Sequence, residues 1–159
     1  MEQTYSYTYF GIGSNTEFIY TGETTGYFES TEAGVFDPDD ITEILGIKPF
    51  RQFKKGEPMP NHPSGRLYTF SDWSAEKSEI DRLDIEKQCL DTIKNLKHKI
   101  PELLKIKSLY DVCFIIQIVP HIYDEEKPIM YFNKEIIEFC YLTGTEISVD
   151  MYVYDSKNS

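Results

Sequence analysis

The chain has 159 residues and a formal net charge of −11, with 40% hydrophobic and 14% aromatic residues. This length fits one domain, and the apolar content excludes disorder for the body of the chain. The three cysteines lack metal-binding spacing, which indicates buried thiols in a reducing compartment. The sequence has neither a signal-peptide pattern nor an apolar run of ~20 residues. We therefore expect a soluble, cytoplasmic protein with no membrane span and no cofactor.

The charge is unevenly distributed along the chain. Residues 1–47 contain nine acidic and no basic residues, whereas residues 48–66 contain five basic residues and one acidic residue. The overall acidity argues against nucleic-acid binding, because phosphate groups are neutralised by clustered Lys and Arg. An acidic first third would attract a basic partner. The alternative is that the acidity only keeps the protein soluble.

The N-terminal residues favour strands. Residues 4–10 alternate, with Tyr5, Tyr7 and Tyr9 on one face, and the glycines at 11 and 13 predict a turn. Two further strands are expected over 17–21 and 25–31. Nine aromatic residues lie within the first 36, and we expect them mainly to pack across strands.

A first helix is predicted after residue 37. Asp37 is a good cap, Pro38 suits the first helical position, and Gly46 ends the helix. Residues 48–53 are expected to be extended. The Pro- and Gly-rich residues 56–65 form a loop, and residues 66–71 alternate as a strand does.

The second half predicts helices around a central strand. Apolar residues at helical spacing over 79–100 indicate one long helix, which Pro101 interrupts before a short helix over 101–107. Residues 109–119 are apolar on both faces, as in a central strand. An acidic loop over 121–128 leads to a helix over 134–143, capped by Asn133 and ended by Gly144.

The last strand is expected over 145–154, and its alternation sets the fold class. Ile147, Val149, Met151 and Val153 are expected to point inward, with polar residues between them pointing to solvent. One solvated face favours an α+β two-layer sandwich, with a largely antiparallel or mixed sheet and helices packed on one face. We expect a single domain over 1–155, in which 1–24 form an aromatic strand extension and 25–155 the core, followed by a disordered tail over 156–159.

Several short motifs occur together within this core. They are Phe36-Asp37-Pro38-Asp39-Asp40-Ile41 leading to Leu45-Gly46-Ile47-Lys48-Pro49, then Arg51, Lys54-Lys55-Gly56-Glu57-Pro58, Ser64-Gly65 and the closing strand 147–154. With these motifs the chain resembles the bacterial family of domain of unknown function 4279, over about residues 25–155. The family pattern has a Trp where this chain has Tyr68, and the N-terminal extension is a second departure.

The resemblance implies an α+β architecture and no established activity or catalytic residues. Some similar proteins look like companions of bacterial toxin systems, which implies an immunity-type binding role. Such an analogy does not fix function.

No catalytic or metal site emerges from the residues themselves. His62, His98 and His121 have no metal-ligand spacing, and the chain has no G-x-S-x-G or local cysteine-nucleophile motif. A triad assembled from distant residues stays open, because its members need not be close in sequence. We therefore expect a protein that is not an enzyme.

The candidate binding residues form two charged groups and one aromatic. Asp39, Asp40 and Glu43 could steer a basic, toxin-like partner. Trp73 after the predicted strand could anchor an interface, or equally it covers the end of the long helix. The basic residues Arg51, Lys54 and Lys55 could hold an anion, or they pair internally with the acidic N-terminal third.

The leading hypothesis is a non-catalytic protein-binding module of immunity-protein type that occludes a basic partner. The alternative is a domain that senses a small anion or other small ligand with residues 51–56. A third hypothesis is an enzyme whose site residues are dispersed in sequence.

Overall fold

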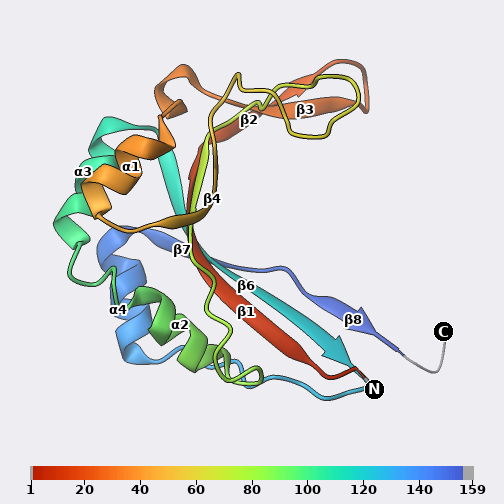
Figure 1. Cartoon of the computed structure of the whole chain (residues 1–159), viewed down its shortest axis with the longest axis vertical. Coiled ribbons are helices and arrows are strands. Elements are labelled where there is room, and N and C mark those ends of the chain that lie inside the picture. The colour runs from red at the N-terminus through yellow and green to blue at the C-terminus, as the bar shows by residue number, and fades with distance from the viewer. Residues whose placement is uncertain (1, 156–159) are drawn as a thin grey trace. The chain divides into compact units, whose positions relative to one another are not determined.

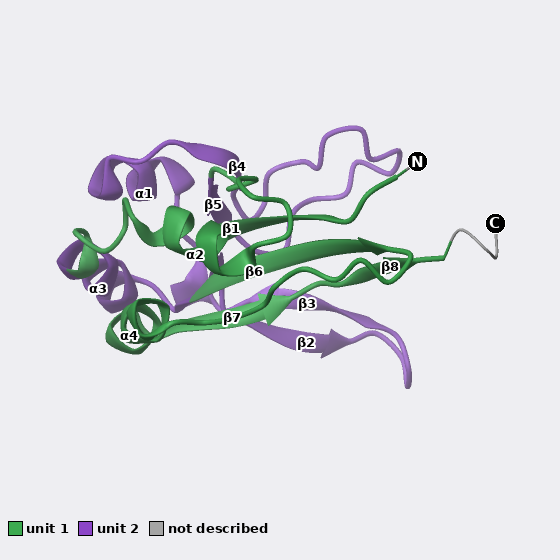
Figure 2. Cartoon of the chain, turned by 90° about the horizontal axis from the view of Figure 1, so that it is seen from below, with its two compact units in different colours: residues 1–11, 76–100, 114–159 green, residues 12–75, 101–113 purple. Residues whose placement is uncertain are grey.

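A computed structural model describes residues 2–155 of the chain (Figure 1). The predicted tail over 156–159 lies outside the described residues. The chain divides into two compact units, each built from separate stretches of sequence (Figure 2). Unit 1 contains residues 1–11, 76–100 and 114–159, and unit 2 contains residues 12–75 and 101–113. The single domain over 1–155 stays a prediction.

The sheet of unit 1 is built around β6 (Val112–Tyr123), whose first two residues belong to unit 2. β6 lies between β1 (Tyr5–Ser14) and β7 (Thr145–Val149), and β8 (Tyr152–Tyr154) also pairs with it. Both β7 and β8 run parallel to β6. The prediction of a central strand at this point of the sequence is confirmed, although the strand extends past residue 119 into the predicted loop.

Helices α2 (Ile85–Ile93) and α4 (Lys134–Thr143) pack against each other and cover one face of this sheet (Figure 1). The ring of Phe139 in α4 lies 6.2 Å from that of Phe10 in β1. Asn133 accepts the Ile136 N–H and Gly144 ends α4 with φ of 70°, so the predicted bounds and caps of this helix are confirmed.

Unit 2 contains shorter elements. β2 (Thr16–Tyr20) and β3 (Gly26–Ser30) form an antiparallel hairpin, and β4 (Pro49–Phe53) pairs antiparallel with β5 (Asp72–Ala75). The end of β1 lies beside β5. The 3-10 turn η1 (Glu32–Gly34) precedes α1 (Pro38–Leu45), and most of α3 (Ile100–Leu109) also belongs here.

The capping signals of α1 are confirmed. The Asp37 carboxylate accepts the Asp39 N–H at 3.0 Å, and Gly46 ends the helix with φ of 65°. On the side that faces the sheet of unit 2, Thr42 Oγ1 accepts a 3.0 Å hydrogen bond from the indole N–H of Trp73.

The described residues therefore form an α+β fold with mixed strand pairing, as predicted. No helix within residues 2–155 is long and apolar enough to cross a membrane.

The predicted long helix over 79–100 is wrong. The helix begins only at Ile85, capped by Asp84, and turns occupy residues 94–98. Two backbone hydrogen bonds explain the late start, because they join Leu83 and Ile85 to Ile129 at 2.6 and 3.0 Å. Asp81 also has φ of 44°, outside the helical region.

Two predicted elements in the N-terminal half are also wrong. Residues 11 and 13 continue β1 instead of forming a turn, since the ladder of β1 extends to Ser14. Residues 66–71 form no strand beyond a single bridge between Leu67 and Pro58, and the strand begins at Asp72 instead. Backbone bonds from Met59 to Arg66 and between Glu57 and Tyr68 hold these residues as the second arm of the Pro-rich loop.

The last predicted strand is broken, and its apolar side chains are not buried. β7 ends at Val149 and β8 begins at Tyr152. Ile147 pairs with Ile116 and Val149 with Ile118, so both lie on the helix-covered face. They are nevertheless exposed, as are Met151 and Val153, because β7 and β8 form the edge of the sheet.

Candidate functional site

The face of unit 1 opposite its helices carries a row of tyrosines. Alternation along β1 buries Ser6, Thr8 and Phe10 under the helices and leaves Tyr5, Tyr7 and Tyr9 on the other face. In β6 and β8, alternate residues also point to this face, and they are His121, Tyr123, Tyr152 and Tyr154. We call this surface the tyrosine face; it consists of Tyr5, Tyr7, Tyr9, His121, Tyr123, Tyr152 and Tyr154.

His121 lies at the centre of the tyrosine face, between two tyrosine rings. Its ring centroid is 4.5 Å from that of Tyr5 and 4.8 Å from that of Tyr152, with interplanar angles of 9° and 10°. These separations match the spacing of neighbouring strands, ~4.8 Å, so each ring stacks on its neighbour across the sheet. The result is a continuous stack of three rings over β1, β6 and β8.

A second pair of rings extends the stack. Tyr123 and Tyr154 are direct neighbours in the β6–β8 register and stack at 4.4 Å. The Tyr154 hydroxyl lies 3.0 Å from Nδ1 of His121, which ties the second pair to the first three rings. Stacked pairs of this kind contribute about 0.5–1.5 kcal/mol each beyond the area they bury.

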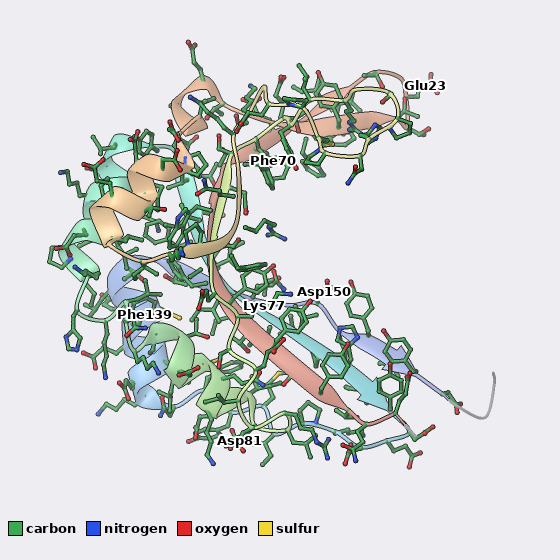
Figure 3. The ribbon with its side chains drawn as sticks, viewed as in Figure 1. Glu23, Phe70, Lys77, Asp81, Phe139 and Asp150 are labelled. Carbon is green, nitrogen blue, oxygen red and sulfur yellow. The ribbon has the colours of Figure 1, made fainter. Side chains whose placement is uncertain are left out.

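Several charged groups lie around the tyrosine face. The ammonium of Lys77 is 4.3 Å from the centroid of the Tyr7 ring, a cation–π contact, and Figure 3 labels Lys77 and Asp150 in this part of unit 1. The Tyr152 hydroxyl donates to the Asp150 carboxylate at 3.0 Å, and this hydrogen bond raises the pKa of Tyr152. A hydrogen bond to Glu2, together with desolvation and nearby charges, raises the pKa of Tyr123 to about 12.

In Tyr123 and Tyr152, a hydrogen bond to a carboxylate raises the pKa of the phenol and so favours its neutral form. A tyrosine ring attracts a cation through its electron-rich face, as Tyr7 does with Lys77, and the carboxylates add negative charge at the rim. The arrangement suits a ligand that carries Arg, Lys or flat apolar groups.

A buried polar network fixes β1 beneath the tyrosine face. The Gln88 side chain of α2 accepts hydrogen bonds from the hydroxyls of Ser6 and Thr8 at 3.0 and 3.1 Å. Its amide nitrogen donates to the carbonyls of Ser6 and Ile80 at 2.8 and 3.0 Å. Every polar atom of this buried side chain therefore has a partner.

The first residues of the chain are held by a second set of bonds. Arg82 donates to the Thr4 carbonyl at 2.6 Å and forms an ion pair with Glu126 at 3.0 Å. The Tyr123 N–H donates to Thr4 Oγ1 at 2.9 Å. These contacts place Tyr5 beside His121.

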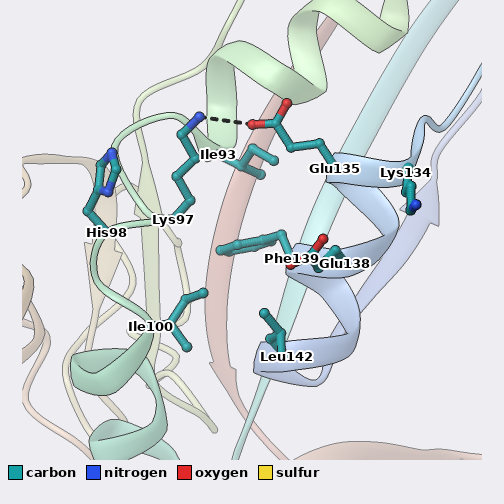
Figure 4. Close-up of a pocket in the computed structure, with 9 residues that line it drawn as sticks. All are labelled: Ile93, Lys97, His98, Ile100, Lys134, Glu135, Glu138, Phe139 and Leu142. Atoms are coloured by element: carbon teal, nitrogen blue, oxygen red, sulfur yellow. Dashed lines mark hydrogen bonds and ion pairs between the residues drawn. The ribbon is translucent and has the colours of Figure 1, made fainter.

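A hollow of about 580 Å³ lies elsewhere in unit 1 (Figure 4). The side chains of Ile93, Phe139 and Leu142 form its apolar floor, and an ion pair of 2.9 Å between Lys97 and Glu135 spans its rim. Cationic and anionic side chains are present in equal number around it, which favours no charged ligand. His98 lies at this rim.

The predicted acidic residues belong to unit 2, whereas the tyrosine face belongs to unit 1. Asp39, Asp40 and Glu43 are exposed on α1 in unit 2. Asp39 accepts a hydrogen bond from the Gln52 side chain at 2.9 Å.

The basic segment of unit 2, residues 51–56, makes several hydrogen bonds and ion pairs within the chain. Lys55 Nζ donates to the Ser30 carbonyl at 3.1 Å and lies 3.5 Å from Glu29, an acid of the N-terminal third. The Lys54 backbone N–H binds Glu57. These bonds agree with the internal-pairing alternative for Lys55.

Arg51 pairs with an acid outside the N-terminal third. Its Nε is 3.3 Å from the Asp72 carboxylate, and its NH2 group is 3.3 Å from Ser74 Oγ. Burial raises the pKa of Asp72, while Arg51 and Ser74 act in the opposite direction.

The interface role expected for Trp73 is wrong. Its side chain is 0% exposed and bonded to Thr42, so it belongs to the core of unit 2.

The sequence revealed only part of the tyrosine face. Tyr5, Tyr7 and Tyr9 were placed on one face of a strand, but their role was expected to be packing. His121 was expected in the acidic loop over 121–128, and no role was predicted for Tyr152 or Tyr154. The available signal was the matching alternation of Tyr152-Val153-Tyr154 with the N-terminal strand.

A family model described as a domain of unknown function, DUF4279, matches residues 22–154 of the chain. No significant match was found among curated proteins or solved structures.

Proposed function

The chain belongs to the DUF4279 family, and we propose that it is a non-catalytic, cytoplasmic protein-binding module that occludes a basic partner with its tyrosine face. The observation that carries this proposal is the stack of Tyr5, His121 and Tyr152 on the sheet face opposite the helices of unit 1. Tyr5 and Tyr152 are 41% and 43% exposed, so a partner can contact them without unfolding the sheet.

Preorganised tyrosines favour protein binding for a physical reason. A ring already fixed by stacking loses little conformational entropy on binding, and tyrosine is enriched at the residues that dominate interface energies. A basic partner is favoured because the face already holds one cation, Lys77 over Tyr7, and because the chain carries a net charge of −11.

An immunity-type role adds a mechanism to this binding. A module of this type would cover the basic catalytic surface of a toxin and so exclude its substrate. The acidity of the chain would speed the encounter, and the tyrosine rings would then bury cationic side chains.

The test is capture from a native lysate with immobilised protein, comparing three forms. They are the wild type, the Tyr5→Ala/Tyr152→Ala double variant, and a control in which Tyr20→Ala/Phe28→Ala removes two exposed aromatic rings from the β2–β3 hairpin. We expect wild type and control to retain one stoichiometric basic protein and the tyrosine-face variant to lose it. Equal capture by all three forms would refute the proposed site.

A second candidate function rests on a hollow of about 350 Å³ in unit 2. Lys55, Arg66, Tyr27 and Tyr68 are among its lining residues, so it could take a small anion beside the 51–56 segment. Stabilisation by one anion in a thermal-shift screen, abolished by Arg66→Ala, would support this function. Because Lys55 already binds Glu29 and Ser30, we rank it below protein binding.

A further inference from the structure

β7 is the outermost strand of the sheet of unit 1. The strand order ends at β7, and no other described strand lies outside it. The Asp150 N–H donates to the Ile118 carbonyl and the Ser148 carbonyl accepts from the Gln117 side chain, so the backbone groups of these residues point toward β6. Backbone direction alternates along a strand, which points the N–H and C=O groups of Ile147 and Val149 to the outer edge.

The side chains of this edge are apolar on one face. Ile147, Val149, Met151 and Val153 are 37% to 70% exposed. Beyond Val149 the row continues into a hollow of about 400 Å³, whose lining includes Ile122, Pro128, Met130, Met151 and Val153. Edge strands are commonly protected by Lys or Pro, yet residues 145–154 contain neither. An exposed apolar edge of this kind is suited to strand pairing.

The opposite face of the same edge is acidic. Glu146 and Asp150 are exposed and lie on the side of the tyrosine face, because they alternate with the apolar row. Pairing with a second copy would bring the acids of both chains onto one face, where like charges at neighbouring positions are destabilising. A strand with Lys or Arg on that face would instead form favourable cross-strand pairs.

We propose that β7 binds an extended segment of the basic partner by strand addition, and that this segment alternates apolar and basic side chains. This inference rests on the proposed function and adds its binding mode. Backbone hydrogen bonds to Ile147 and Val149 give affinity, the apolar row and the hollow accept every second side chain, and Glu146 and Asp150 accept the cations between them.

The probe is a short synthetic peptide of alternating Lys and Val, measured by fluorescence anisotropy against the full chain. We expect Val149→Pro to weaken its binding at least about tenfold, because proline removes an outward N–H that strand addition requires. The melting temperature should change little, since that N–H has no role in pairing with β6. A peptide N-methylated at alternate residues keeps its charge, and we expect its binding to be lost.

Charge variants test the polar face. Glu146→Lys should weaken the Lys–Val peptide and strengthen a Glu–Val peptide, whereas the matched reversal Glu43→Lys in unit 2 should change neither. Equal binding of the N-methylated and unmodified peptides would overturn strand addition. A dimer of the free protein that Val149→Pro dissociates would also overturn it, by making a second copy the occupant.

The two proposals fail separately. If Val149→Pro still captures the full basic partner, strand addition is refuted and the proposed function stands. If Tyr5→Ala/Tyr152→Ala still captures it, the proposed tyrosine face is refuted instead.

Discussion

The tyrosine face of unit 1 and the basic segment of unit 2 use charge and aromatic rings in opposite ways. In unit 2, Arg51 and Lys55 contact Asp72 and Glu29, so part of their charge is already compensated within the chain. In unit 1, the rings of Tyr5, His121 and Tyr152 stack face to face across the sheet and remain partly exposed. Clustered charge in a sequence therefore does not show whether the charges are free, because internal ion pairs such as those of Arg51 and Lys55 form only in the fold.

The largest expected effect is a loss of stability on replacing a core aromatic residue, compared with replacing an exposed one. Trp73→Ala should lower the free energy of unfolding by about 3–5 kcal/mol, because it removes a fully buried side chain and leaves a cavity. Urea unfolding followed by circular dichroism measures this. Tyr152→Ala is the matched exposed substitution, and we expect a much smaller loss. Similar losses for both would contradict the contrast between the two units.

The support beneath the tyrosine face should be almost as sensitive. Gln88→Ala leaves the buried hydroxyls of Ser6 and Thr8 without their acceptor and should cost about 2–3 kcal/mol. Lys87→Ala, on the exposed side of the same helix, should cost less than about 0.5 kcal/mol. If both substitutions had the same small effect in chemical denaturation, the network would not be what fixes β1.

Low pH should destabilise both units, through the protonation of a different carboxylate in each. Hydrogen bonds from Arg82 lower the pKa of Glu126 in unit 1, and those from Asn15 and Thr31 lower the pKa of Asp111 in unit 2. A lowered folded-state pKa gives stability that is present above the unfolded-state pKa and is lost as the pH falls through the folded-state value.

We therefore expect the melting temperature to fall between about pH 5 and pH 3. Glu126→Gln and Asp111→Asn should each flatten this fall, as circular dichroism melts across the range would record. A slope that neither substitution changes would mean that other carboxylates control acid unfolding.

The smallest effect is expected in the basic segment. Lys55→Met removes a partly exposed ion pair with Glu29 and one hydrogen bond to Ser30, and should cost less than about 1 kcal/mol. It should leave capture of a basic partner unchanged. A substantial loss of capture on Lys55→Met, with the fold intact by circular dichroism, would move the binding site into unit 2.

Local signals in the sequence predicted the elements that local bonds determine. Asp37 with Gly46 and Asn133 with Gly144 marked both ends of α1 and α4, because caps act within a few residues of the chain. The helix over 79–100 failed because bonds between Ile129 and residues 83 and 85, far apart in sequence, hold its first part in a loop. Periodicity does not contain that information.

The site was predictable only in part for a related reason. Alternation placed Tyr5, Tyr7 and Tyr9 on one face, but only strand order brings His121 and Tyr152 beside them. Ile147 and Val149 point to the helix-covered face of the sheet, as predicted, but they are exposed instead of buried. Alternation in the sequence does not reveal that a strand lies at the edge of a sheet. Trp73 was misassigned because its partner Thr42 lies in an element distant in sequence.

The most direct measurement is isothermal titration of the captured basic partner with the wild type, with Tyr5→Ala/Tyr152→Ala and with the control Tyr20→Ala/Phe28→Ala. We predict that the tyrosine-face variant loses at least about 30-fold in affinity, the effect of removing an interface hot spot, and that the control keeps wild-type affinity. Wild-type affinity in the tyrosine-face variant, or an equal loss in the control, would contradict a binding site on the tyrosine face.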